Sequence, residues 1–522
     1  MTINTNISDR AAALKAEALD NSSLFDVHVW ASDEAKEVNN AVHIIYQQLV
    51  TDTNFKGHVN IRRKHIKTLL LDLYIKWLTD PKKYVSIYLR HEYYEKLVSR
   101  YNKLHISSTT TIIVHALRKS GYIEFEKGHY WDPLRNIQEA KSKKSHVTRI
   151  RATRKLIDLI KRVKIKPEMV ERVPNIETII LRKYDLEKSR SIDCKYNDTP
   201  KRIEWRKSLV AYNNLLRKTY IDIPNAPPEG IPCKQGARAI KKKKKPRRVR
   251  ITQYEKFVRR IFNNERWDHG GRFYGGWWQR IPEKWREQIR IWNSPIQERD
   301  YKGLHISLLY KIEHETMVGD PYVLDGYENT DEMRSFLKKA LLSAINAKNI
   351  GEAVKVLNME INFDLDTYGW IREEKIDLKK LILALRDKHP KIKDHFFNAK
   401  GIELQNIDAL MAQNIIDKFT SEGVPVLCIH DSFIIRADKA EALDKQMTIA
   451  FNEAMDQMGL DSNSRPETDF DGMETGLFHA MITRPEWIEL KIAFYKEKNN
   501  YPEWDKKMQD FKRLNLFDHY VI

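Results

Sequence analysis

Two aspartates stand where carboxylates could converge on divalent cations. Asp300 follows the extended segment Pro295–Arg299, and Asp431 lies at the tip of a predicted hairpin between the strands Val424–Ile429 and Phe433–Arg436. A carboxylate in such apolar surroundings is costly unless it is paired or binds a metal. Phosphoryl transfer from a nucleoside triphosphate uses two cations about 4 Å apart, held by carboxylates on rigid elements. The two aspartates are candidates for that role, and a purely structural turn around Asp431 is the alternative.

A helix predicted between them, over Asp331–Ala347, carries cations on one face. Arg334, Lys338, Leu342 and Asn346 are four residues apart and therefore share that face. Two cations followed by an apolar side chain and an amide could hold a triphosphate and then flank a base pair. The alternative is an ordinary solvated face, because Arg and Lys at this spacing are common on helix surfaces.

Upstream, aromatic and basic residues are interleaved from Arg266 to Trp292, before a buried helix predicted over Leu304–Lys311. Arg272 and Gln279 lie among the rings. Interleaved rings and guanidinium groups suit stacked bases and paired phosphates along one strand. An ordinary aromatic core is the alternative. The rings are Trp267, Phe273, Tyr274, Trp277, Trp278, Trp285 and Trp292.

In their order and spacing, these segments resemble motifs of the DNA polymerase I family (family A) and of the related single-subunit phage-type RNA polymerases. Asp300-Tyr301 is similar to the first palm motif. His430-Asp431-Ser432-Phe433 is similar to the second, which reads His-Asp-Glu in the DNA enzymes and His-Asp-Ser in the RNA enzymes. The helix from Arg334 matches the fingers motif Arg-x3-Lys-x3-apolar-x3-Tyr-Gly. The resemblance covers residues 266–435, about a third of the chain.

The resemblance implies roles for individual residues. Asp300 and Asp431 would bind two magnesium ions, or manganese in their place, and Lys338 would donate a proton to pyrophosphate. The incoming nucleotide would contact Arg334, Lys338, Leu342, Asn346 and His305. By the same resemblance, His430 and Gln405 would contact primer or template. Their charge or amide groups make Arg272, Gln279, Arg118, Lys243 and Arg247 further candidates for that contact.

Departures from the family pattern leave the choice of sugar open. Asn346-Ala347 stands where the family has Tyr-Gly, and His305 stands where the DNA enzymes have a sugar-excluding Glu. Ser432 matches the RNA enzymes, whereas the short chain suits a small replication or repair enzyme. A DNA polymerase is the first expectation, and an RNA polymerase or primase of the same superfamily is the alternative. No proofreading nuclease is expected, because the Asp26-Val27-His28 stretch lacks the Asp-x-Glu pair with which such a domain begins.

The N-terminal part predicts a winged helix-turn-helix domain. Helices over Ile61–Leu78, His91–Tyr101 and Thr109–Ser120 are followed by two short strands, Tyr122–Glu126 and His129–Asp132, joined by a tight turn. In such a domain one helix enters a nucleic-acid groove and the hairpin forms the wing.

The third of these helices would be the recognition helix. It would offer Thr109, Thr110 and Arg118 to the groove, and the basic segment Val147–Thr153 could add a further contact. Such domains also mediate protein contacts, which is the alternative.

The charge of the chain suits a polyanionic partner. Its 91 Lys and Arg residues outnumber its 72 Asp and Glu residues, which gives a net charge of +19. Between Gly236 and Arg260, twelve basic residues accompany one acid, and Lys243 and Arg247 belong to this run. We expect phosphate contact there. A solvated loop or a nuclear-localisation-like tract is the alternative.

The remaining composition indicates a protein without membrane spans. It contains no run of about 18 apolar residues, and we expect no secretory signal at the N-terminus. Cys194, Cys233 and Cys428 are too far apart for a zinc knuckle or a disulfide framework. We expect a monomer with free thiols in the cytoplasm, which would be that of a bacterial host if the gene is carried by a phage or plasmid.

Together these patterns predict an α+β, multidomain right-hand polymerase preceded by a winged helix-turn-helix domain. The expected layout is an N-terminal region over 1–150 with the winged helix at about 60–150, a basic helical thumb-like region over 151–265, palm and fingers over 266–460, and a C-terminal extension over 461–522. The expected function is template-directed DNA synthesis for a small phage-type or plasmid-type replicon. A non-enzymatic replication initiator with a vestigial palm, and a structural protein that binds nucleic acid by charge alone, are alternatives of other classes.

Overall fold

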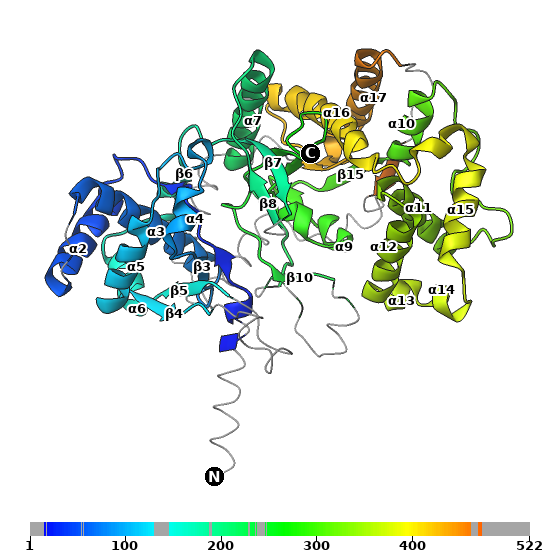
Figure 1. Cartoon of the computed structure of the whole chain (residues 1–522). Coiled ribbons are helices and arrows are strands. Elements are labelled where there is room, and N and C mark those ends of the chain that lie inside the picture. The colour runs from blue at the N-terminus through cyan, green and yellow to red at the C-terminus, as the bar shows by residue number, and fades with distance from the viewer. Residues whose placement is uncertain are drawn as a thin grey trace, which may run out of the picture. The chain divides into compact units, whose positions relative to one another are not determined.

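The computed structural model has a mixed α and β fold that divides into two compact units (Figure 1), and it confirms the expected α+β class. Among the described residues, the first unit extends to Glu177 and the second begins at Thr178. Residues 151–177 therefore belong to unit 1, whereas the sequence grouped them with the region up to 265. The structure describes residues 15–129, 146–460 and 468–471, apart from 17, 54, 56, 187–189, 228–229, 235, 237–245 and 247.

Unit 1 packs helices against a small sheet. α3 (Val59–Thr79) is its central element, because every residue from Thr68 to Lys76 is buried. It contacts α2 (Lys36–Asp52), α5 (Thr109–Lys119) and the sheet of order β1-β3-β5-β4. The strands are β1 (Ser23–Leu24), β3 (Val85–Ile87), β4 (Ile123–Glu126) and β5 (Thr148–Ala152), with a separate pair β2 (Val29–Trp30) and β6 (Glu171–Arg172). Further helices of the described part are α4 (His91–Glu95) and α6 (Arg154–Arg162).

Two predictions for unit 1 were wrong in detail. The helix predicted over His91–Tyr101 breaks after α4 and resumes only as a 3₁₀ turn, Ser99–Tyr101. The strand after α5 does not turn back on itself at once. β4 pairs with β5 instead, and His129 pairs with His146. The physical reason is that β5 alternates buried and half-buried residues, which gives it an apolar face for the core. Residues 130–132 of the predicted strand lie outside the described residues.

Two four-stranded sheets organise the described part of unit 2. One has the order β13-β12-β7-β8 and the other the order β16-β17-β15-β18, in which all neighbours are antiparallel. The strands are β7 (Ile179–Asp185), β8 (Arg190–Asp193), β12 (Arg259–Phe262), β13 (Gly270–Tyr274), β15 (Ile296–Tyr301), β16 (Leu427–Ile429), β17 (Ser432–Arg436) and β18 (Thr468–Asp471). Short pairs join β9 (Ile221–Asp222) to β14 (Arg290–Ile291) and β10 (Ile231–Pro232) to β11 (Arg248–Val249).

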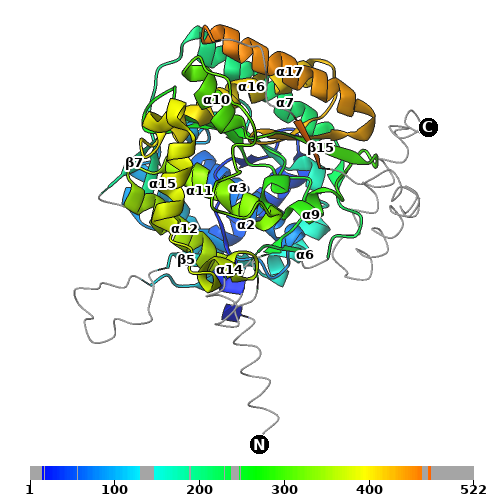
Figure 2. The ribbon, with the colours of Figure 1, turned by 90° about the vertical axis from the view of Figure 1, so that its right-hand side faces the viewer.

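Helices cover the sheets of unit 2 and form a further helical group (Figures 1 and 2). α16 (Gly401–Ser421) packs against β13 and α17 (Ala440–Gln457), and α17 also packs against β15. In the helical group, α12 (Ile350–Phe363) contacts both α11 (Asp331–Asn346) and α15 (Leu378–Lys388). The other helices are α7 (Pro200–Lys218), α9 (Glu283–Arg286), α10 (Leu304–Ile312), α13 (Leu365–Tyr368) and α14 (Trp370–Glu373).

α11 is held at both ends. The Thr330 hydroxyl accepts a hydrogen bond from the Met333 N–H at 3.1 Å, which caps the first turn. At the other end, N–H groups of residues 397–400 donate to the carbonyls of Ala344, Ile345 and Ala347. These carbonyls would otherwise have no partner at a helix end. The C-terminal end of α11 is thereby fixed to the chain that leads into α16.

Residues 178–265 are not mainly helical, contrary to the sequence prediction. α7 is the long helix of this segment, and the segment also contributes β7, β8 and β12 to one sheet. β7 begins with three consecutive buried residues, Ile179–Leu181, and pairs in parallel with β12. A short apolar run buried on both faces cannot be distinguished from a buried helix by periodicity alone.

The aromatic cluster upstream of Asp300 is part of the core of unit 2. Phe273, Trp277 and Trp278 are 0% exposed, and the Trp278 Nε1–H donates to the Cys428 carbonyl at 3.2 Å. The expectation that these three rings stack on nucleic acid is therefore wrong. Burying such large rings stabilises the junction between β13 and β16.

Candidate active site

The hairpin of β16 and β17 places His430 and Asp431 at its tip. Ile429 pairs with Ser432, which leaves a two-residue turn between the strands. His430 adopts a φ angle of 62°, as the first central residue of such a turn requires. The predicted hairpin is confirmed, although Ser432 already belongs to β17. Every residue of β17 is buried, so the turn projects from a rigid strand.

β15 brings Asp300 beside this turn. Asp300 lies opposite Ser432 in the antiparallel register, and Asp431 immediately precedes Ser432 in the chain. Side chains alternate along a strand, so Glu298 and Asp300 share a face and Tyr301 lies on the other. Glu298 accepts a hydrogen bond from the Ser432 hydroxyl at 2.5 Å, and the Tyr301 hydroxyl donates to a carbonyl of α17 at 2.6 Å. The strand therefore runs on through Asp300, further than the sequence predicted.

The Asp300 carboxyl has a strongly perturbed environment. Burial, and after it the charge of Asp431, raise its pKa to about 8, while the charge of Lys338 lowers it. An ordinary aspartate has a pKa of about 3.9. Among the described residues, Asp300 Oδ1 is buried without a hydrogen-bond partner. Two carboxylates this close resist ionising together near neutral pH unless a cation joins them.

The pair therefore fits a divalent cation. It offers carboxylate oxygens, which magnesium and manganese prefer, and one of them is buried and unpaired. In the ranges that the structure covers, no group of three or more His, Cys, Asp or Glu side chains could hold a metal. The ligands supplied by the described side chains would thus be Asp300 and Asp431.

α11 presents its predicted face to solvent. The exposed members of this face are Arg334, Lys338, Leu342 and Asn346. Lys338 is close enough to Asp300 for its charge to lower the pKa of that carboxyl. Arg334 instead forms an ion pair with Asp320 at 2.7 Å. Of the two cations on this face, Lys338 is the one whose charge acts on Asp300.

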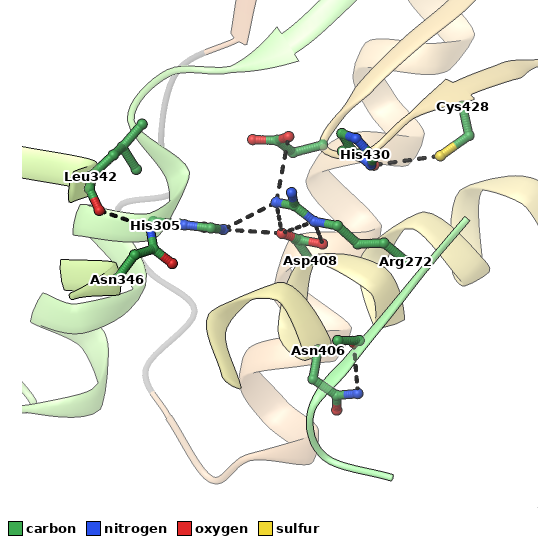
Figure 3. Close-up of polar contacts among 10 residues, drawn as sticks. Arg272, His305, Leu342, Asn346, Asn406, Asp408, Cys428 and His430 are labelled. Carbon is green, nitrogen blue, oxygen red and sulfur yellow. Dashed lines mark hydrogen bonds and ion pairs between the residues drawn. The ribbon is translucent and has the colours of Figure 1, made fainter. Parts of the chain in front are cut away.

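Arg272 and Asp408 form a buried ion pair, which Figure 3 shows, and Asp431 lies beside it. The Arg272 Nε of β13 donates to both carboxylate oxygens of Asp408 of α16 at 3.0 Å, and the Asp408 side chain is 1% exposed. Although burial lowers the pKa of Arg272, the hydrogen bonds to Asp408 raise it above its ordinary value. Arg272 Nη2 is also 3.8 Å from Asp431 Oδ1. Arg272 thus has two carboxylates within reach, and Asp408 holds it more closely.

Two histidines border this ion pair. His305 of α10 places its Nε2 3.0 Å from Asp408 Oδ2, and Figure 3 shows its ring between Asn346 and the ion pair. Burial, and then Arg272, lower the pKa of His430. The Nδ1 atoms of both histidines are buried without a hydrogen-bond partner among the described residues. Each ring therefore keeps one polar atom that nothing in the described chain satisfies.

The two glutamines predicted to contact primer or template differ in their surroundings. Gln279 Nε2 donates to the carbonyls of Phe273 and Cys428, both at 2.9 Å, and its Oε1 accepts from the Gly275 N–H at 2.9 Å. The amide nitrogen therefore joins β13 to β16, and the amide oxygen holds the residue that follows β13, so Gln279 has a role in the fold. Gln405 is half-buried on α16, one turn from the buried ion pair.

Of the other residues predicted to contact nucleic acid, the structure describes Arg118 and Thr110 of α5. Arg118 is exposed on α5, with its guanidinium carbon 4.5 Å from the centre of the Phe125 ring. Thr110 is 0% exposed, so the expectation that it reaches a groove was wrong. Lys243 and Arg247 lie outside the described residues.

Two acids near the site, Asp408 and Glu298, were not predicted from the sequence. Asp408 lies between Ile407 and Ala409, both buried, and an acid within an apolar helix face needs a partner. That signal could have identified it. Glu298 alternates with Asp300 on β15, which is a weaker signal. Asp469 lies opposite Asp300 in the backbone register of β18, a strand that the sequence did not predict.

No protein-family model matches the chain, and no curated protein is similar to it at a significant level. None of the helices in the described part is long and apolar enough to cross a membrane.

Proposed function

We propose that the chain is a template-directed nucleic-acid polymerase of the DNA polymerase I type, with deoxynucleotides as its substrates. The observation that carries the proposal is the pair Asp300 and Asp431. Asp300 lies on β15 and Asp431 lies in the turn that leads into the neighbouring strand β17. Asp300 has a pKa of about 8 and a buried oxygen without a partner among the described residues, and Lys338 lies within electrostatic reach of it. Two negative charges held close together at a buried site destabilise a protein. Cation binding, which needs both charges, therefore explains the pair of aspartates better than a structural role does.

The residues of the site suit nucleotide addition. The 3′-hydroxyl oxygen of a growing strand attacks the α-phosphorus of the nucleotide, and the bond to pyrophosphate breaks. Asp300 and Asp431 would hold magnesium or manganese, which when bound supplies charge neutralisation at the attacking and leaving oxygens. Lys338 Nζ would give its proton to the leaving pyrophosphate. Arg334 would bind the phosphates once its ion pair with Asp320 opens.

A polymerase that uses ribonucleotides, including a primase, is the second candidate. His305 favours it, because this histidine, whose Nε2 lies 3.0 Å from Asp408 Oδ2, stands where the DNA enzymes have a sugar-excluding Glu. Ser432 is weaker support than the sequence suggested, since its hydroxyl is bound to Glu298 within the sheet.

Unit 1 would bind nucleic acid as a winged helix. Support comes from α5, which exposes Arg118 and is followed by the antiparallel strands β4 and β5. The connection between these strands is longer than the tight turn that the sequence predicted. In this proposal α5 contacts duplex and helps to place the template for unit 2.

Primer extension tests the proposal. Wild type, Asp431→Asn and Asp438→Asn are compared on a primed DNA template with magnesium, with deoxynucleotides and ribonucleotides in separate reactions. Asp438 is a matched control, because it follows β17 on the same chain segment and forms an ion pair with Arg436 at 2.8 Å, away from Asp300 in sequence. We expect wild type and Asp438→Asn to extend with deoxynucleotides and Asp431→Asn to lose roughly 10³-fold or more in rate.

Other outcomes distinguish the alternatives. Extension with ribonucleotides alone would replace the first candidate with the second. If neither primed nor unprimed template gave product while the protein still bound DNA, the polymerase proposal would be contradicted. The chain would then be better described as a replication initiator with a vestigial catalytic site.

A further inference from the structure

Unit 1 contains a cavity that the proposed polymerase chemistry does not use. Its volume is about 450 Å³, and it lies between the C-terminal end of α3, the strands β4 and β5, and α6. Small-ligand sites have volumes of roughly 300–1,000 Å³. The residues that carry the argument are Trp77, Lys82, Arg151, Arg154 and Lys161, all of which line it.

The charge of this cavity is positive. Four of its lining side chains are cationic, and two, Glu124 and Asp158, are acidic. Arg151 Nη2 donates to both Glu124 oxygens, at 2.8 and 2.6 Å, and Arg154 lies 3.6 Å from Asp158. Each acid therefore has its own arginine. Lys82 and Lys161 enter no ion pair among the residues in view, and both are exposed. The two lysines are left to bind an anion.

Trp77 gives the cavity an aromatic wall. Its half-buried ring stacks on Tyr74, with centroids 6.4 Å apart and planes 15° apart. The Tyr74 hydroxyl donates to the Ile165 carbonyl at 3.0 Å, which fixes the ring behind Trp77. Lys161 Nζ is 5.5 Å from the centre of the Trp77 ring. A supported flat ring beside exposed ammonium groups is an arrangement that holds an unpaired base and its phosphate.

We propose that this cavity binds a nucleotide unit of single-stranded nucleic acid, with the base against Trp77 and the phosphodiester beside Lys82 and Lys161. The two faces of a base are covered by its neighbours within a duplex, so only an unpaired or unstacked base can lie on the ring. This contact differs from the duplex contact proposed for α5. It also does not depend on catalysis by unit 2, and it would hold an unpaired template segment near the duplex.

The first experiment measures binding of fluorescent oligo(dT) to the full chain by anisotropy, from about 50 to 300 mM salt. Lys82→Ala/Lys161→Ala is compared with Lys96→Ala/Lys103→Ala, which removes two exposed lysines of the same unit that do not line the cavity. Each phosphate contact on a single strand contributes about 0.7 to the slope of log affinity against log salt. We expect the cavity variant to lose roughly tenfold in affinity and about 0.7 in slope, because both lysines contact one phosphate, and we expect the control to lose much less.

The second experiment tests the ring. Trp77→Leu and Trp77→Phe are compared for binding to oligo(dT) and to an abasic strand of the same length, with circular dichroism to show that both variants are folded. Wild type and Trp77→Phe should prefer oligo(dT). Trp77→Leu should lose that preference while still binding through its charges, because base stacking contributes roughly 1–3 kcal/mol per base, equivalent to roughly 5-fold to 150-fold in affinity.

Three results would overturn the inference. One is an equal effect of the two lysine pairs, and another is an undiminished preference for bases in folded Trp77→Leu. The third is competition by free dTTP as effective as that by oligo(dT), which would make the site one for a mononucleotide. Binding by Asp431→Asn keeps the inference separate from the polymerase proposal, because that variant should bind oligo(dT) as wild type does whether or not the chain is a polymerase.

Discussion

At the scale of single residues, Asp300 retains a proton at neutral pH that an ordinary aspartate has lost. Its pKa is raised to about 8 by burial and then by Asp431, whereas the unfolded chain has a value of about 3.9. Between these two values the folded protein binds more protons than the unfolded one, so folding stability falls as the pH rises. The Asp300 carboxyl therefore lowers folding stability as the pH rises, and its negative charge would be stabilised by a bound cation.

Replacing Asp300 with Asn should stabilise the protein, and more so at pH 8 than at pH 5. The amide keeps the shape of the side chain and removes the charge that must form as the pH rises. We expect the gain in unfolding free energy to grow by roughly 1–3 kcal/mol between the two pH values. Thermal unfolding followed by circular dichroism at both pH values measures it. Asp387→Asn, at an exposed position beside Arg386, is the control, and an effect of Asp300→Asn that is the same at both pH values would contradict the assignment.

The buried pair of Arg272 and Asp408 gives a second prediction. Asp408→Asn leaves the Arg272 charge buried with a weaker partner, so we expect a loss of roughly 3–5 kcal/mol in unfolding free energy. The double variant Arg272→Met/Asp408→Leu should recover most of that stability, because apolar residues of similar size can replace a buried ion pair.

The nucleotide-addition activity of the double variant shows whether Arg272 has a role beyond stabilising the fold. If Arg272 contacts the primer strand, the double variant should be stable and still lose nucleotide addition, mainly through weaker binding of the primed template. A double variant that recovers both stability and activity would restrict Arg272 to a structural role.

At the scale of elements, the site depends on the joint between α11 and α16. The last carbonyls of α11 accept hydrogen bonds from residues 397–400. Asn346, at the end of α11, donates to the Leu342 carbonyl at 2.7 Å. Gly401, at the start of α16, lies so close to the Asn346 amide that a Cβ atom would displace it. The joint therefore sets how Lys338 and Asp408, on different helices, are placed around one site.

A double-mutant cycle tests this joint. Gly401→Ala should destabilise the protein by roughly 1–2 kcal/mol, because overpacking forces the Asn346 side chain to move. In an Asn346→Ala background the same change should be neutral or slightly stabilising, since Ala favours a helix over Gly. Unfolding in urea gives the four free energies. Equal effects of Gly401→Ala in both backgrounds would show that the two residues do not meet.

The sequence correctly predicted those helices and strands that are specified by residues close together in the chain. The four-residue spacing from Arg334 predicted α11 and its exposed face, and the apolar strands around Asp431 predicted the hairpin. It failed where pairing is distant in the chain, as for Phe125 of β4, which lies opposite Ile150 of β5. Arg272 and Asp408 were missed as a pair for the same reason, because they lie on a strand and a helix that 136 residues separate. The sequence did not decide the role of Trp277 and Trp278, because tryptophan occurs both in buried cores and in sites where rings stack on a ligand.

At the scale of the whole molecule, the net charge of +19 is the dominant feature. Charge of this size attracts nucleic acid without reading its sequence, because counterions released from phosphates drive the binding. We expect affinity for primed DNA to fall roughly 10³-fold or more between about 50 and 200 mM salt. Titrations at fixed magnesium measure it. Affinity that is indifferent to salt would contradict a phosphate-driven interaction.

The central claim is that Asp300 and Asp431 act together on a cation, and a manganese titration tests it most directly. Free manganese is followed by electron paramagnetic resonance, and proton release in weak buffer is recorded at pH 7 with the same samples. Wild type and Asp438→Asn should bind the ion and release about one proton for it, with affinity rising from pH 6 to pH 8 as the Asp300 proton becomes easier to displace. Asp300→Asn and Asp431→Asn should lose both binding and proton release. Manganese uptake by Asp300→Asn that equals wild type, with the same proton release, would contradict the account.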